Sequence, residues 1–209
     1  LLKRQWGYQL NSPNSTQSTF WEGYQADGQF AFQGIYMSHA HGWAAGPASA
    51  LSLYVMGLRP LPSVAQQQRA RTRYAVVPQP SLPSLRWING SMAMKDGRIE
   101  LAWNASDDGR FTLEIVLDEA HCAASTGYIG LPLLNGLTAE SATVAISSVP
   151  SSYSQSNDAD TLPVLMPADD ADLQSISAGG IQRLWYKHDA DNAMRGGSER
   201  GCRTRFELH

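Results

Sequence analysis

The stretch GRIELAWNASDDGRFTLEIVL, Gly97–Leu117, decides the fold class of this chain. Apolar and polar side chains alternate before and after its Asp-Asp-Gly turn, and a period of two is typical of strands that bury one face. The pair Asp96-Gly97 predicts a hairpin turn directly before the stretch, because Asp-Gly suits tight turns between antiparallel strands. The stretch therefore predicts neighbouring antiparallel strands.

Similar short apolar segments, separated by turn residues, continue on both sides of this stretch. Short strands at regular spacing are typical of an all-β sandwich, so we expect an antiparallel β-sandwich over residues 66–209. Residues 151–180 are rich in Ser, Asp and Pro, and we expect a solvated loop there. The further expected strands are 74–76, 85–94 with an interruption at Asn89-Gly90, 128–133, 142–147, 183–188 and 202–208.

The preceding part of the chain has a helical pattern. Apolar side chains from Trp43 to Leu58 recur at spacings of three and four, which indicates one buried helical stripe. Pro47 falls in the first turns, where a missing backbone N–H costs least, and Gly57 marks the end. We therefore predict a helix that begins near Gly42, and an α+β fold class overall.

Composition excludes several classes of partner. The 209 residues contain 19 acidic and 16 basic side chains, a net charge of −3, and no basic run. We therefore expect neither a nucleic-acid partner nor a polybasic membrane anchor. No apolar stretch approaches the roughly 18 residues of a membrane span. Phosphate-binding and dinucleotide-binding glycine motifs are absent from the sequence, and no Cys/His cluster has metal-ligand spacing, so no cofactor and no metal are expected.

Cysteines and sequons bear on the compartment. Cys122 and Cys202 fit one disulfide of a secreted protein, and two free buried thiols fit nearly as well. Three sequons place candidate N-glycosylation sites at Asn14, Asn89 and Asn104, although such triplets also arise by chance in Ser-rich chains. Together these features favour a secreted, extracellular glycoprotein.

Glu22 is the first candidate for chemistry. It follows Trp21 within a dense aromatic segment, and a carboxylate in an aromatic-lined cleft can serve as a general base. Aromatic faces beside a carboxylate also suit sugar binding. The alternative is an ordinary surface or capping residue.

His39 and His41 are the second candidates. Two histidines one residue apart face opposite sides of a strand, which makes a poor two-ligand metal site. His41 lies at the start of the expected helix, where its ring could reach into a cleft. A capping or hydrogen-bonding role is the alternative for His41.

Three segments together resemble the end of the catalytic domain of family 78 glycoside hydrolases, the α-L-rhamnosidases, and most of all their fungal members. The following β pattern, up to about residue 150, is similar to the C-terminal β-sandwich of those enzymes. The three segments are TFWEGY (Thr19–Tyr24), HGWAAGP (His41–Pro47) and YVMGLRP (Tyr54–Pro60), and the β pattern includes VPQP at 77–80, LRW at 85–87 and GRIELAW at 97–103.

The resemblance implies an (α/α)6 barrel that hydrolyses terminal α-L-rhamnosyl groups from glycosides or polysaccharides with inversion. Residues 1–65 would be the last helical hairpin of this barrel. Glu22 matches the general base, Trp21 and His41 match residues of the sugar pocket, and Trp43 helps to shape that pocket. The family's general acid lies well upstream of the Trp-Glu segment. It would therefore come from the remainder of the same polypeptide or from a companion fragment.

Alternatives remain for the chain as a whole. Leu1–Trp6 reads like the middle of a helix, so we expect the C-terminal part of a longer protein, with a processed mature N-terminus as the alternative. A non-catalytic carbohydrate-binding or scaffold module would keep the β-sandwich. A related six-hairpin glycosidase could act on another sugar.

Overall fold

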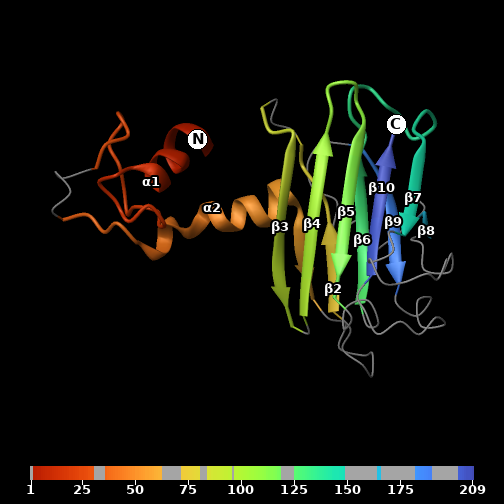
Figure 1. Ribbon diagram of the computed structural model, residues 1–209, viewed down its shortest axis with the longest axis horizontal. Coiled ribbons are helices and arrows are strands. Elements are labelled where there is room, and N and C mark those ends of the chain that lie inside the picture. Colours follow the sequence, from red (N-terminus) through yellow and green to blue (C-terminus); the bar gives the residue numbers. More distant parts are fainter. Residues whose placement is uncertain are drawn as a thin grey trace. The chain divides into compact units, whose positions relative to one another are not determined.

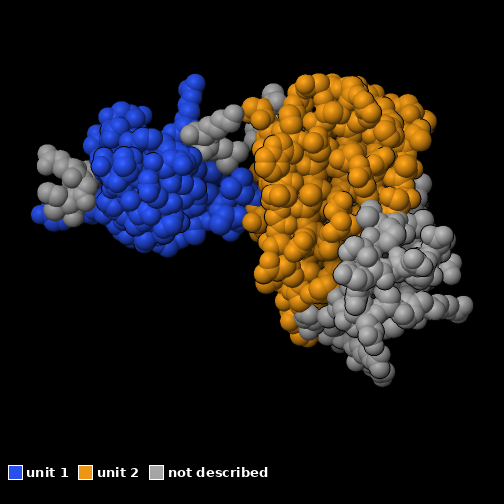
Figure 2. All heavy atoms as spheres, in the orientation of Figure 1, with its two compact units in different colours: residues 1–51 blue, residues 52–209 orange. Residues whose placement is uncertain are grey.

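The computed structural model describes residues 2–30, 36–62, 72–80, 84–95, 97–118, 125–148, 164–165, 182–189 and 202–209. The chain divides into two compact units, Leu1–Leu51 and Ser52–His209, which Figure 2 draws in blue and orange. The domain boundary after residue 65 stays a prediction. The first compact unit ends at Leu51, and the strand Leu58–Leu61 pairs in register with Thr72–Val76 inside the second unit.

The second unit is mostly β-structure, arranged as two five-stranded sheets (Figure 1). The first sheet has the order β1-β2-β6-β9-β8, and the second has the order β3-β4-β5-β10-β7. The strands are β1 (Leu58–Leu61), β2 (Thr72–Val76), β3 (Trp87–Met94), β4 (Gly97–Ala105), β5 (Phe111–Leu117), β6 (Ser125–Pro132), β7 (Val144–Ser148), β8 (Val164–Leu165), β9 (Arg183–Asp189) and β10 (Cys202–Leu208).

One strand pair departs from the expected antiparallel arrangement. Strands β2 and β6 are parallel, whereas the other neighbouring strands are antiparallel. After β2 the chain forms three alternating strands of the second sheet and then returns to the first sheet as β6. An odd number of intervening strands brings β6 back in the direction of β2.

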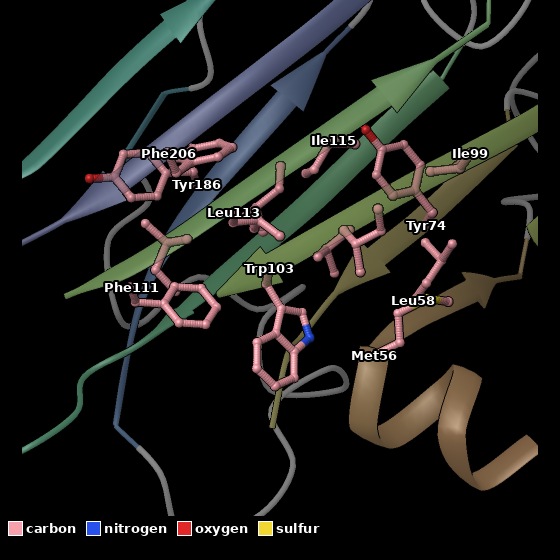
Figure 3. Close-up of a cluster of buried hydrophobic side chains, with 14 of the residues drawn as sticks. Met56, Leu58, Tyr74, Ile99, Trp103, Phe111, Leu113, Ile115, Tyr186 and Phe206 are labelled. Carbon is pink, nitrogen blue, oxygen red and sulfur yellow. The ribbon is translucent and has the colours of Figure 1, made fainter. Parts of the chain in front are cut away.

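Both sheets contribute to one hydrophobic core, shown in Figure 3. In β5 the alternation is complete: Phe111, Leu113, Ile115 and Leu117 are buried, and the residues between them are partly exposed. The β-rich α+β class predicted from the alternation is therefore confirmed. The buried members of this core are Met56, Leu58, Tyr74, Val76, Ile99, Leu101, Trp103, Ala105, Phe111, Leu113, Ile115, Leu117, Ile129, Leu131, Tyr186, Phe206 and Leu208.

Two predicted boundaries need correction. Asn89-Gly90 does not interrupt its strand, because β3 runs through it from Trp87 to Met94. Gly90 serves close packing instead, since a Cβ there would lie 2.8 Å from the Met56 sulfur. The strand β8 falls within the stretch expected to be a loop, and it pairs with β9.

The predicted helix near Gly42 is confirmed, with a changing hydrogen-bond pattern, but the expected buried stripe is not continuous, because Trp43 and Tyr54 are exposed. It consists of the 3-10 turn η3 (Gly42–Ala45), α2 (Gly46–Ser49) with Pro47 in its first turn, and the π-helical turns η4 (Ala50–Met56). Gly57 ends it with φ +90°, and a Cβ at this glycine would lie 2.3 Å from the Val77 backbone. Leu58, expected in the helical stripe, is the first residue of β1.

The first unit contains little regular structure in its described part. The π-helical turn η1 (Leu2–Trp6) continues into α1 (Gly7–Asn11), and an isolated bridge joins Tyr24 to Phe30. Among the described residues, no helix is long and apolar enough to cross a membrane.

Candidate functional site

A short backbone ladder in the first unit positions Glu22. Its N–H donates to the carbonyl oxygen of Ser38 over 2.9 Å, and the N–H of Ser38 donates to Glu22 Oε2 over 3.0 Å. The N–H of His41 donates to the carbonyl oxygen of Phe20 over 3.2 Å. Two segments that are some twenty residues apart in the sequence are thereby held side by side, and Glu22 is placed beside His41.

The side chains of Glu22 and His41 form a carboxylate–imidazole pair. Glu22 Oε2 lies 3.6 Å from His41 Nδ1, and each side chain is 29% exposed. The separation exceeds a hydrogen bond, so the pair becomes an ion pair when the imidazole is protonated. His41 precedes η3 and makes no side-chain cap hydrogen bond, which argues against the capping interpretation of this histidine.

Trp43 contacts both members of the Glu22–His41 pair and lies at the surface. Its ring centroid lies 4.0 Å from that of His41, and its Nε1–H donates to the carbonyl oxygen of Glu22 over 3.0 Å. Trp43 is nevertheless 73% exposed, so its indole can be reached by a ligand. A carboxylate beside an open indole can take a proton from water while a sugar ring stacks on the aromatic face.

Trp21 lies in a different environment from Trp43. It is only 2% exposed and stacks on Phe30 with ring centroids 3.7 Å apart. Phe30 in turn stacks on His39, with ring centroids 4.2 Å apart. His39 and His41 therefore contact different residues, as expected for two side chains one residue apart. The backbone N–H of Trp21 donates to Gln9 Oε1 over 3.1 Å. Trp21 therefore lies in the interior of the unit, next to Glu22 in the chain, and is closed to solvent.

Two residues that build this site carry no clear signal in the sequence. Ser38 positions Glu22 through its backbone N–H and C=O, which no residue type signals, while its hydroxyl accepts the N–H of Ala40 over 3.3 Å. Gln9 is 2% exposed, and its position three residues after Trp6 on the same helical side is the only hint of its burial.

The other predicted sites fall outside this cluster. Asn14, Asn89 and Asn104 are all exposed, which suits N-glycosylation acceptors. Cys122 lies outside the described residues, and of Cys202, the first residue of β10, only the backbone is described. The disulfide therefore stays a prediction. Within the described ranges, no three His, Cys, Asp or Glu side chains gather as metal ligands.

Comparison of the chain with protein-family models, with curated proteins and with solved structures found no match.

Proposed function

We propose that this chain is part of an inverting glycoside hydrolase of the α-L-rhamnosidase type, with Glu22 as its general base. The observation that carries the proposal is the 3.6 Å approach of Glu22 Oε2 to His41 Nδ1 beside the exposed indole of Trp43. These three residues come from two of the segments that resemble family 78 enzymes, and the ladder through Ser38 brings them together.

The reaction needs two carboxyl groups. Glu22 takes a proton from a water molecule while the oxygen of that water attacks the anomeric carbon of the sugar. The bond from this carbon to the glycosidic oxygen breaks, and a general acid on the opposite side protonates the leaving oxygen. Inverting geometry places the two carboxyl groups about 6.5–9.5 Å apart, which leaves room for the water. The general acid comes from the remainder of the polypeptide or from a companion fragment.

The roles of the neighbouring residues follow from their contacts. The backbone N–H of Ser38 fixes one carboxylate oxygen of Glu22. The imidazole of His41 binds a sugar hydroxyl, and Trp43 offers a stacking face for the ring. Trp21, buried in its stack with Phe30, supports the segment that carries Glu22.

The described part of the first unit contains buried polar groups without a hydrogen-bond partner. Nε1 of Trp21 and Nε2 of Gln5 are buried without a hydrogen-bond partner among the described residues. An unsatisfied buried donor costs about 1–3 kcal/mol, so an acceptor supplied from elsewhere would be favourable. Tyr36, which is 85% exposed, and Trp43 are large aromatic surfaces that such a partner or a substrate could cover. The setting we propose for the whole enzyme is extracellular, with a rhamnosylated glycoside or polysaccharide as substrate and no cofactor.

The test is Glu22→Gln in the complete protein. General acid–base catalysis contributes about 10²–10⁴-fold, so kcat on nitrophenyl α-L-rhamnopyranoside should fall by that factor while the protein still folds. Glu100→Gln, at an exposed position on β4, is the matched control and should leave the rate unchanged. Near-normal turnover of the Glu22 variant would remove Glu22 from the role. A panel of other nitrophenyl glycosides decides whether rhamnose is the sugar.

A further inference from the structure

An exposed tryptophan lies on the outer face of the second sheet. Trp87, the first residue of β3, is 63% exposed, an unusual state for the largest apolar side chain on a sheet. Asn89 follows two residues later on the same face, and Asn104 of β4 lies opposite Trp87 in the register. Both asparagines are exposed, and both begin sequons, Asn89-Gly90-Ser91 and Asn104-Ala105-Ser106.

The register brings Trp87 and Asn104 as close as facing side chains can be. The N–H of Ala105 donates to the carbonyl oxygen of Arg86 over 2.7 Å, so Arg86 and Ala105 form a hydrogen-bonded pair of the antiparallel ladder. The adjacent pair, Trp87 and Asn104, is therefore a non-hydrogen-bonded pair. In such pairs the Cα atoms are about 4.5 Å apart and the side chains are closest.

The space beside Trp87 has room for a sugar ring. Asn89 lies opposite Ala102, whose small side chain leaves a hollow of about 360 Å³ over the sheet. Trp87, Asn89 and Asn104 all line this hollow. Neither asparagine amide has a hydrogen-bond partner within the described ranges.

The strand that carries Trp87 also has an unprotected edge. Among the described strands, β3 pairs only with β4, and its sequence WINGSMAM contains no charged residue and no proline. Edge strands ordinarily use charges, prolines or bulges to prevent pairing with other chains. Asn89 lies near the middle of this strand, where a bulky substituent would hinder such pairing.

We propose that Asn89 and Asn104 carry N-linked glycans whose first sugars stack on Trp87 and cover this face and edge. In the transfer, the side-chain nitrogen of asparagine bonds to the anomeric carbon of a lipid-linked oligosaccharide. The bond from that carbon to the pyrophosphate breaks, the amide loses a proton, and the lipid pyrophosphate leaves. The first sugar then presents its apolar C–H face to the indole. The proposal rests on the extracellular location proposed above and is independent of rhamnosidase activity.

The first measurement is site occupancy. The full chain is secreted from a eukaryotic cell, and glycopeptides are mapped by mass spectrometry. We expect glycans on Asn89 and Asn104. Ser91→Ala and Ser106→Ala should each abolish the glycan of their own sequon, and Ser91→Thr should retain it, because the hydroxyl at the third position is required. Unmodified Asn89 and Asn104 would overturn the proposal and would leave the face open to a free ligand.

The second measurement tests the stack itself. Trimming with an endoglycosidase that leaves the first sugar should preserve the midpoint of thermal unfolding of the second unit. The Asn89→Gln, Asn104→Gln double variant lacks both glycans and keeps the hydrogen bonds that Ser91 makes with Arg98 and that Ser106 makes with Asp108 and Arg110. It should lower this midpoint by about 2–4 °C. In a Trp87→Ala background the glycans should make no difference. Thr16→Ala removes the Asn14 glycan of the first unit and is the matched control, with no expected change. The stacking would be overturned if removal of the glycans lowered the midpoint equally in the wild-type and Trp87→Ala backgrounds. It would also be overturned if trimming to the first sugar lowered the midpoint.

Discussion

At the scale of single residues, Tyr74 shows how one buried polar group ties two strands together. It lies on β2 in the core, and its hydroxyl is hydrogen-bonded to the Ser125 side chain of β6. Its ring fits because residue 127 of β6 is glycine: a Cβ there would lie 2.3 Å from the Tyr74 ring. Burial raises the pKa of Tyr74 well above its usual value near 10, because the charged phenolate would lose its hydration.

This raised pKa predicts alkaline instability that Tyr74→Phe removes. Below pH 10 Tyr74 is protonated in both states, so its contribution to stability is fully present. As the pH rises above about 10, Tyr74 ionises in the unfolded chain but not in the folded one, and the free energy of unfolding falls by about 1.4 kcal/mol per pH unit. Urea unfolding between pH 9 and 11 measures the slope. The Tyr74→Phe variant should lose the part of this slope that Tyr74 contributes. Tyr36→Phe, a change at an exposed position, should have the slope of the wild type. Equal slopes for wild type and Tyr74→Phe would contradict the prediction.

At the scale of elements, the alternation in β5 separates side chains that hold the sheets together from those that do not. Leu113 is fully buried in the shared core, whereas Val116 lies on the other face of the strand and is only partly buried. Large-to-small substitution in a core costs the transfer free energy plus a cavity.

We therefore predict opposite outcomes for two alanine substitutions in this one strand. Leu113→Ala should lower the free energy of unfolding by about 2–5 kcal/mol. Val116→Ala should cost well under half as much, because less apolar area is returned to water. Urea unfolding of both variants gives the comparison. Similar losses at the two positions would mean that the two faces of β5 are equally packed.

The same elements show what the sequence can and cannot predict. Strands β4 and β5 were predictable because their period of two is long and uninterrupted. Strands β1 and β8 were missed because four and two residues are too short to show a period. The expected break at Gly90 was wrong because the contact that requires glycine there comes from Met56, far away in the sequence. The crossover that makes β2 and β6 parallel likewise depends on the order of strands in two sheets, which no local pattern records.

The candidate site was predictable to a similar degree. Glu22 and His41 were singled out by residue type and by resemblance, and their spacing gave no reason to expect contact. The contact depends on backbone hydrogen bonds of Ser38, which leave no mark on side-chain identity. The different surroundings of Trp21 and Trp43 also escape the sequence, because two indoles look alike until tertiary packing buries one of them.

At the scale of the whole molecule, stabilising contacts are distributed unevenly between the two units. The second unit contains both sheets and their shared core. In its described part the first unit has two helical segments, residues 2–11 and the start of the helix that begins at Gly42, and it leaves Tyr8, Tyr24, Tyr36 and Trp43 exposed. So small a unit buries a low fraction of its surface and is marginal by itself.

This asymmetry predicts that residues 52–209 fold without the first unit. A chain that begins at Ser52 keeps Met56 against Gly90 and keeps β1 on β2, so its core is complete. It should show β-type circular dichroism and a cooperative thermal transition at the temperature of the corresponding transition in the full chain. A chain that begins at Val77 lacks β1 and β2. It should not fold, because β6 then has no partner strand on one side. Residues 1–51 alone should show no cooperative transition, because so small a unit buries too low a fraction of its surface to be stable by itself. A 52–209 chain that fails to fold, or a stable isolated first unit, would show that stability is shared between the units.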